Sequence, residues 1–157
     1  MLFRSEPPAA SRAATARIAH SLCAAGAGEA LPPPAAAVRS ARFVWFGDFL
    51  LPLEEIAAAL SRLSGLGLTG RLVQIADPIE ADFPFAGRIR FTFGGEEAIF
   101  GRAETVAEDY RRRFAGHCQG IKALALSQGW TYRFHRTDRP AKEALAALYA
   151  EAAGDSA

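Results

Sequence analysis

The chain has 157 residues, of which 50% are hydrophobic and 22% charged, with a formal net charge of +1 at pH 7. This length suits one domain with a single core, and the composition is typical of soluble globular proteins. A net charge near zero excludes general electrostatic attraction as a basis for binding nucleic acid or an anionic membrane. No apolar run reaches the roughly 18 residues of a membrane helix, so we expect a cytoplasmic protein without membrane or nucleic-acid partners.

Residues 1–41 are predicted to form a region apart from the domain. Ala14, Ile18 and Leu22 recur every fourth residue within an Ala-rich segment, which predicts a helix over 11–25 with a narrow apolar stripe. Residues 26–40 are rich in Gly, Pro and Ala, which predicts an extended linker. The domain is therefore expected over 42–153.

The run Phe43–Phe46, four bulky apolar residues followed by Gly47 and Asp48, predicts a strand buried on both faces. Such strands lie in the middle of parallel sheets. Open α/β sheets bind ligands just beyond the carboxyl ends of these strands. Asp48 is therefore the first candidate site residue.

A helix is predicted from Pro52, followed by a strand at Arg71–Ala76 that leads into Asp77. The predicted inward face of the helix consists of Leu53, Ile56, Leu60 and Leu63. A strand, helix and strand at this spacing form a right-handed crossover, so the two strands should be parallel neighbours.

The rest of the chain predicts one hairpin, two helices and one strand. Strict alternation over 88–93, a turn at Gly94-Gly95 and the return over 97–100 predict a β-hairpin. A long helix is expected over 104–128, with Val106, Tyr110, Phe114, Cys118, Ile121 and Ala125 on one face. A strand over 130–135 precedes a last helix, whose expected inward residues are Ala141, Leu145, Leu148 and Ala152. The fold class is α/β, an open, mostly parallel sheet with helices on both faces and a hairpin insertion.

Four polar residues follow the predicted strand ends: Asp48, Asp77, Thr137 and Asp138. Together they form a candidate interaction surface, and each also has a purely structural interpretation. Asp48 can accept amides in the turn before Pro52, and Asp77 can form an Asx-turn. Thr137 or Asp138 can cap the last helix. The basic run 111–113 is interpreted as a solvated helix face paired with nearby acids.

Several short motifs resemble one bacterial family in their order and spacing. They are Gly47-Asp48-Phe49-Leu50 with Pro52, Gln74 through Asp77-Pro78, Phe83-Pro84-Phe85-Ala86-Gly87-Arg88, Tyr110 with Arg111, and Thr137-Asp138-Arg139-Pro140. This series resembles the domain-of-unknown-function 58 family over roughly residues 42–149. Members of that family carry a von Willebrand factor A-like (Rossmann-like) domain and are often encoded beside MoxR-type AAA ATPases.

The chain departs from this family at its metal site. A von Willebrand A-like domain builds that site mainly from an Asp-x-Ser-x-Ser motif after its first strand, and no such motif occurs here. The resemblance implies the carboxyl-terminal part of the domain, with Asp48 as the second acidic contributor to the site. One carboxylate with waters holds Mg²⁺ weakly, so no cofactor is expected in this chain, whereas a complete domain could bind Mg²⁺.

The resemblance implies a non-enzymatic adaptor that works with a MoxR-type ATPase through the surface around Asp48. One alternative is a Mg²⁺-dependent phosphoryl-transfer enzyme that uses Asp48, Asp77 and Asp138. Against it, the sequence shows no Gly-rich phosphate loop and no Lys near the strand ends. A further alternative is a truncated product without activity of its own. Its first strand would then leave an open edge, through which copies are expected to associate.

Overall fold

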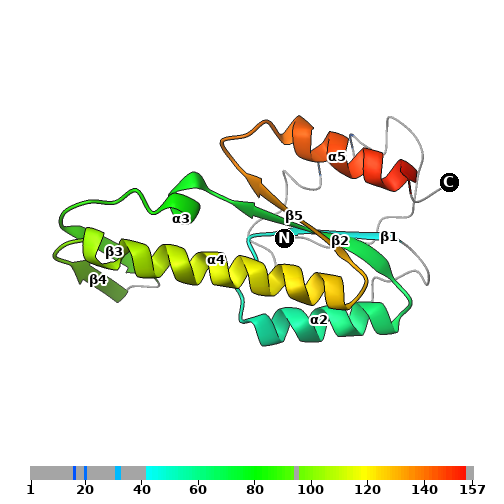
Figure 1. Ribbon diagram of the computed structural model, residues 1–157, viewed down its shortest axis with the longest axis horizontal. Helices are drawn as coiled ribbons and strands as arrows, with labels where there is room; N and C mark the ends of the chain where they lie inside the picture. The colour runs from blue at the N-terminus through cyan, green and yellow to red at the C-terminus, as the bar shows by residue number, and fades with distance from the viewer. Residues whose placement is uncertain (1–15, 17–19, 21–30, 33–41, 94–95, 155–157) are drawn as a thin grey trace. The chain divides into compact units, whose positions relative to one another are not determined.

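The computed structural model describes residues 16, 20, 31–32, 42–93 and 96–154. The predicted N-terminal helix and linker, and the division at residue 41, lie almost wholly outside these residues. In chain order the elements are β1 (Arg42–Gly47), α2 (Leu53–Gly65), β2 (Thr69–Ala76), α3 (Pro78–Asp82), β3 (Ile89–Phe93), β4 (Glu96–Phe100), α4 (Glu104–Ser127), β5 (Thr131–Arg136) and α5 (Ala141–Gly154) (Figure 1).

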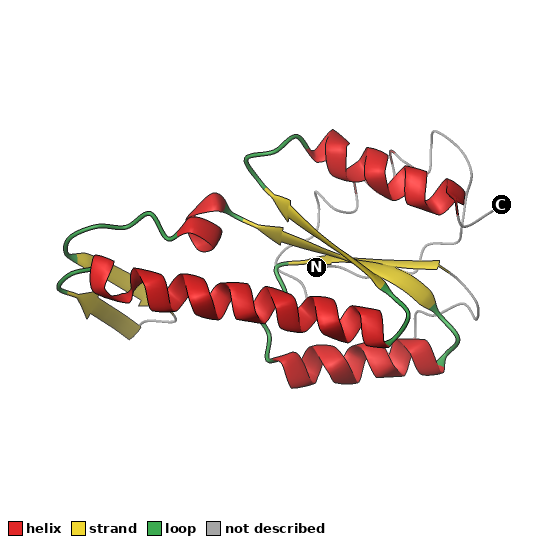
Figure 2. Ribbon diagram, viewed as in Figure 1, coloured by secondary structure: helices red, strands yellow, loops and turns green. Residues whose placement is uncertain are grey.

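The main sheet has three strands in the order β1-β2-β5. Strands β1 and β2 pair in parallel, from Arg42 opposite Thr69 to Gly47 opposite Gln74. The arrows of β2 and β5 run the same way in Figure 2. The predicted crossover and the predicted strand neighbours are confirmed, and the fold is an open parallel α/β sheet flanked by helices, consistent with part of a Rossmann-like fold.

The prediction that β1 is buried on both faces is wrong. Trp45 is buried, whereas its neighbour Val44 is 37% exposed. The reason is that Val44 and Trp45 point to opposite faces of the strand, and the core cluster with α2 and α4 contains Trp45 but not Val44. Among the described strands, β1 has a neighbour on one side only. The expected association of copies through this edge stays a prediction.

The described residues fall into two compact units, which we describe separately. The first unit comprises Met1–Gln74 and Ile121–Arg133, and the second Ile75–Gly120 and Phe134–Ala157.

The core of the first unit forms where α2 and the last turns of α4 pack with the sheet. The predicted stripe of α2 is confirmed, since Ile56, Leu60 and Leu63 are buried. They belong to one apolar cluster with Trp45, Phe49, Ala59, Leu68, Leu72, Ile121, Ala125 and Trp130. Burial of these large side chains is the main favourable term in the stability of the unit.

The second unit contains the predicted hairpin and a smaller apolar cluster. Strands β3 and β4 pair antiparallel, from Ile89 opposite Phe100 to Phe93 opposite Glu96, and form a sheet of their own. A hairpin alone is marginally stable in water. Here Ile89 packs against a cluster that contains Phe83, Ala103 and Ala107, which ties the hairpin to the start of α4.

Helix α5 is less buried than its sequence predicts. Leu145, expected to face inward, is 58% exposed, and Tyr149 is also exposed. Ala dominates this helix (AKEALAALYAEAAG), so most of its side chains are too small to form a wide apolar face.

Candidate functional site

Asp48 lies in a tight turn directly after β1. Its Oδ1 accepts a hydrogen bond from the amide of Leu50 at 3.2 Å. Helix α2 starts at Leu53 and has no side-chain cap. The structural interpretation of Asp48, a carboxylate that accepts an amide in the turn before Pro52, is therefore confirmed.

The turn has an uncommon backbone conformation at Phe49. This residue has φ of 55°, in the left-handed region that non-glycine residues seldom adopt. Its side chain is buried, and its ring lies 4.9 Å from the ring of Trp45. The buried ring turns the chain so that the next residue, Leu50, is 57% exposed beside the exposed Asp48.

In the second unit, Asp77 caps the short helix α3. Its Oδ1 accepts from the amide of Ile79 at 2.8 Å, and the amide of Asp77 donates to Glu80 Oε2 at 3.0 Å. These reciprocal bonds form a capping box. The predicted Asx-type role of Asp77 is confirmed, although α3 itself was not predicted.

Asp77 and Thr137 are brought together. The hydroxyl of Thr137 donates to Asp77 Oδ2 at 3.3 Å, and the amide of Thr137 donates to the carbonyl of Ala76 at 3.0 Å. Both carboxylate oxygens of Asp77 thus accept a hydrogen bond.

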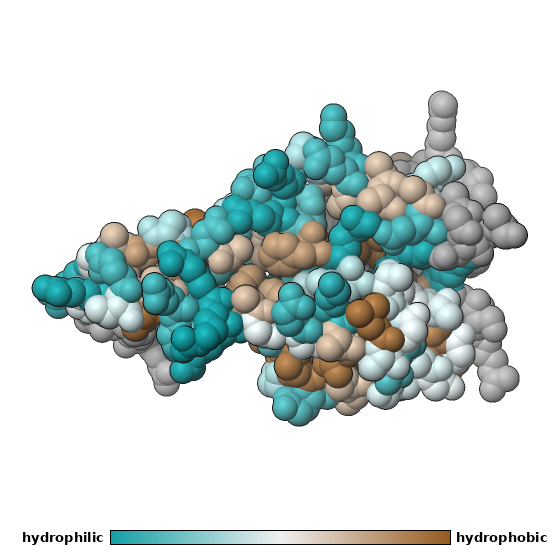
Figure 3. Space-filling view, in the orientation of Figure 1, coloured by the Kyte–Doolittle hydropathy of each residue, from teal (hydrophilic) through white to brown (hydrophobic). Residues whose placement is uncertain are grey.

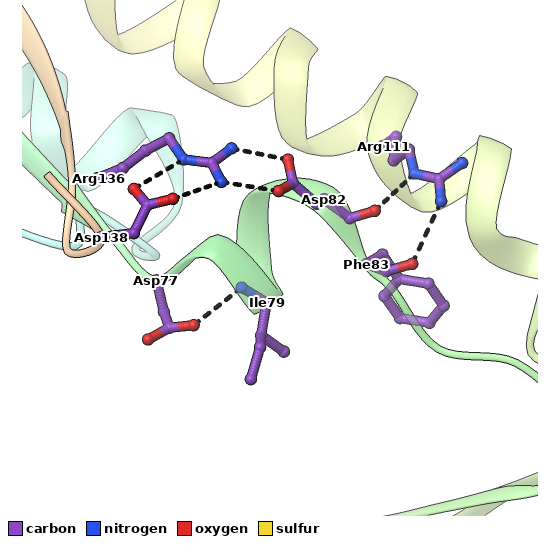
Figure 4. Close-up of polar contacts among 7 residues, drawn as sticks. All are labelled: Asp77, Ile79, Asp82, Phe83, Arg111, Arg136 and Asp138. Atoms are coloured by element: carbon purple, nitrogen blue, oxygen red, sulfur yellow. Dashed lines mark hydrogen bonds and ion pairs between the residues drawn. The ribbon is translucent and has the colours of Figure 1, made fainter.

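Asp138 belongs to an ionic group that we call the Arg136 bridge, made of Arg136, Asp82 and Asp138. The guanidinium donates to both oxygens of Asp82, each at 2.8 Å, and to those of Asp138 at 3.2 and 3.0 Å (Figure 4). Hydrogen bonds from Arg136 lower the pKa of Asp82 and of Asp138. The same bonds raise the pKa of Arg136, so all three groups are charged at neutral pH.

The expectation that Thr137 or Asp138 caps the last helix is wrong. Helix α5 begins at Ala141, and the amide of Glu143 donates to the carbonyl of Pro140. The hydroxyl of Thr137 and the carboxylate of Asp138 are engaged by Asp77 and Arg136, respectively, whose bonds compete with a cap.

Arg111 is exposed, as predicted for a solvated face, but it has partners outside α4 that were not predicted. Its guanidinium donates to the carbonyls of Asp82, at 2.7 Å, and Phe83, at 3.3 Å, and so satisfies the end of α3 (Figure 4). Its neighbours behave as predicted, because Arg112 and Arg113 are exposed and both pair with Asp109 on α4.

A loop that carries one of the family-like motifs is fixed to the start of α4. The amide of Gly87 donates to Glu104 Oε1 at 2.8 Å, and the carbonyl of Gly87 accepts from the amide of Ala103 at 2.8 Å. Amide bonds to Glu104, including that from Gly87, lower its pKa. Gly87 has φ of +74°, which a residue with a side chain adopts only with strain. Its place in the motif therefore has a structural explanation.

The residues at the Asp48 turn do not fit a bound Mg²⁺. Asp48 Oδ1 is held by an amide, and the main-chain oxygen of Asp48 accepts from Gln74 Nε2 at 3.0 Å. Mg²⁺ requires near-octahedral oxygen ligands, which this turn does not supply. In the part of the chain that the structure describes, no group of three or more His, Cys, Asp or Glu could hold a metal ion.

Sequence reasoning gave no site role to four residues that organise these sites, Gln74, Asp82, Arg111 and Arg136, although Gln74 and Arg111 stand in the family-like motifs. A signal existed for Gln74, because a lone amide within the apolar strand 72–76 indicates a buried polar group that needs partners. For Asp82 and Arg136 the sequence carries no signal of their pairing, since they are 54 residues apart.

Apolar residues are also present on the surface. The face shown in Figure 3 carries brown apolar patches among hydrophilic residues. Exposed large hydrophobic residues include Val44, Leu50, Leu66, Ile79, Leu126, Phe134, Leu145 and Tyr149. Every helix among the described residues is too short or too polar to cross a lipid bilayer.

Comparison with known proteins does not assign this chain to a family. No family model matches the sequence, and no curated protein matches it. A solved structure of an uncharacterized membrane spanning protein from Vibrio fischeri aligns with 16% identity and a TM-score of 0.31. The alignment covers 74% of this chain and 47% of that one, so the chain spans less than half of that protein. A similarity this low carries no argument about fold or function.

Proposed function

We propose that this chain is a non-enzymatic, cytoplasmic protein-interaction module of the von Willebrand factor A-like type. It binds a MoxR-type AAA ATPase through the Asp48 turn, defined as Asp48, Phe49 and Leu50. The family assignment and the partner rest on the motif resemblance. The choice of surface rests on the geometry of this turn.

The observation that carries the proposal is that Asp48 and Leu50 are exposed, while Phe49, the residue between them, is buried and fixes the turn. Leu50 presents 57% of its surface to solvent, while the intervening Phe49 is buried in the core. A rigid loop that presents an apolar side chain beside a carboxylate loses little conformational entropy on binding. The complementary surface is an apolar pocket with a cationic side chain at its rim.

The phosphoryl-transfer alternative is less well supported. It requires carboxylates that are open to a metal ion, yet Asp138 is bound by the guanidinium of Arg136. Asp77 accepts hydrogen bonds at both oxygens, from Ile79 and Thr137. Neighbouring donors of this kind compete with a cation for the same oxygens.

The test is a calorimetric titration of the chain with a MoxR-type AAA ATPase from the same organism, repeated with Asp48→Ala and with chelator present. We expect the wild-type chain to bind and Asp48→Ala to bind about tenfold more weakly, the usual effect of losing one interfacial charged contact. Chelator should leave the affinity of this chain for the ATPase unchanged, because the turn does not fit a metal. Absence of binding by the wild-type chain, or equal affinity of the variant, would contradict the proposal.

A further inference from the structure

Among the described residues, Gln74 is a fully buried polar side chain whose amide oxygen and amide nitrogen both form hydrogen bonds. It has 0% of its surface exposed. Its Nε2 donates to the main-chain oxygen of Asp48 at 3.0 Å, and its Oε1 accepts from the hydroxyl of Tyr132 at 2.6 Å. Burying an amide costs free energy unless such bonds compensate for the lost water.

These two bonds connect all three strands of the main sheet. Gln74 lies near the end of β2, the central strand, and reaches β5 through Tyr132 and the residue after β1 through Asp48. An amide is well suited to this place, because it donates at one end and accepts at the other. A carboxylate would repel the Asp48 carbonyl, and an apolar side chain would remove both hydrogen bonds.

The hydrogen bond from Gln74 to Asp48 lies next to a residue with an unfavourable backbone conformation. Phe49, the next residue, has φ of 55°, a conformation that persists only where the surroundings enforce it. The contacts that support it include the packing of Phe49 on Trp45, the bond from the Leu50 amide to Asp48 Oδ1 and the bond from Gln74 to the Asp48 carbonyl.

We propose that Gln74, oriented by Tyr132, is the positioning residue of the Asp48 turn. It fixes the peptide after Asp48 and so keeps Asp48 and Leu50 in the arrangement that a partner recognises. The inference rests on the proposed function for its binding consequence. Without Gln74 the turn would adopt other conformations, and the affinity for the partner would fall with the competent fraction.

The experiment compares Gln74→Met, which keeps the length but removes both bonds, with Tyr132→Phe and with the control Val73→Ala. Val73 is buried in the same strand, and its side chain points to the opposite face of the sheet from that of Gln74. Global stability is measured by denaturation for each variant. Amide hydrogen exchange is then followed at Phe49 and Leu50.

We expect Gln74→Met to speed exchange of the Leu50 amide at least about tenfold beyond any change in global stability, the equivalent of one lost hydrogen bond. Tyr132→Phe should have a smaller effect of the same kind, and the double variant should resemble Gln74→Met alone. Val73→Ala should change the exchange rate of the Leu50 amide only as far as it changes the global stability. Equal corrected exchange in Gln74→Met and Val73→Ala would overturn the proposal. If Gln74→Met does not fold, the corrected exchange rate of Tyr132→Phe is compared with that of Val73→Ala instead. Equal rates in these two variants would overturn the proposal.

Titration of the same variants with the MoxR-type ATPase tests the binding consequence. We expect about tenfold weaker binding by Gln74→Met and no change for Val73→Ala. Faster exchange with unchanged affinity would overturn the positioning role. If the wild-type chain fails to bind, the proposed function is wrong, while the exchange data still decide whether Gln74 fixes the turn.

Discussion

The guanidinium of Arg136 donates to both carboxylate oxygens of Asp82, each at 2.8 Å. This bidentate pair joins the end of β5 to the end of α3, a helix that contains no buried residue. Arg111 holds the same helix end through main-chain carbonyls. Polar contacts therefore hold α3 itself, and apolar burial begins at its C-cap residue, Phe83.

Acidification should destabilise this arrangement. The pKa values of Asp82 and Asp138 are lower in the folded chain than the ordinary 3.8, chiefly because Arg136 donates hydrogen bonds to both. The pairing therefore contributes fully above about pH 4 and is lost as the pH falls through the lowered values. We expect the melting temperature of the wild-type chain to fall below pH 4 more steeply than that of Asp82→Asn.

The control for this experiment is Glu108→Gln, which removes one exposed negative charge from α4. Its melting temperature should follow the wild-type pH dependence. Identical pH profiles for Asp82→Asn and wild type, measured by calorimetry from pH 6 to 2, would show that the Arg136 bridge does not contribute.

The capping box of α3 provides a second prediction. Asp77→Ala removes the acceptor for the Ile79 amide, and we expect the variant to lose about 1 kcal/mol in the free energy of unfolding. Asp77→Ser keeps a capping oxygen and should lose much less. Urea denaturation measures both values. A loss as large for Asp77→Ser as for Asp77→Ala would mean that the contact with Thr137, not the cap, is the stabilising one.

Two glycines should respond in opposite directions to substitution by Ala. A Cβ at Gly70 would lie 2.4 Å from the Phe43 carbonyl oxygen and 2.5 Å from the Trp130 ring. We expect Gly70→Ala to cost about 1–3 kcal/mol, as overpacking does elsewhere. Gly116 lies inside α4 with no atom within 4 Å of the added Cβ, so Gly116→Ala should gain roughly 0.5–1 kcal/mol. Denaturation curves that rank the two variants the other way would contradict the packing around β2.

Much of the fold was predictable from periodicity. The parallel pairing of β1 with β2 followed from a strand, helix and strand at crossover spacing, and the hairpin from alternation around Gly94-Gly95. The predicted inward face of α4 was partly correct, because Ile121 and Ala125 are fully buried, whereas the other four residues are half-buried. Each of these features depends on a local sequence pattern that is repeated along the whole helix or strand.

The failures concern contacts that a local pattern cannot specify. The burial of β1 depended on which of its faces the core covers, and that of Leu145 on how few large side chains α5 carries. The roles of Arg111 and Thr137 were decided by partners far away in the sequence, in α3 and at Asp77. Helix α3 was a missed local signal, because Asp77, Pro78 and Glu80 together indicate a capped helix start.

The most direct test of the central claim, that the Asp48 turn binds the partner, compares Leu50→Ser with Leu126→Ser. The two leucines are both 57% exposed, and Leu126 lies on α4 in the same unit. Each variant is titrated by calorimetry against the MoxR-type ATPase. The account predicts about tenfold weaker binding for Leu50→Ser, the effect of losing one apolar anchor, and wild-type affinity for Leu126→Ser. Wild-type affinity for Leu50→Ser, or equal losses for both variants, would contradict it.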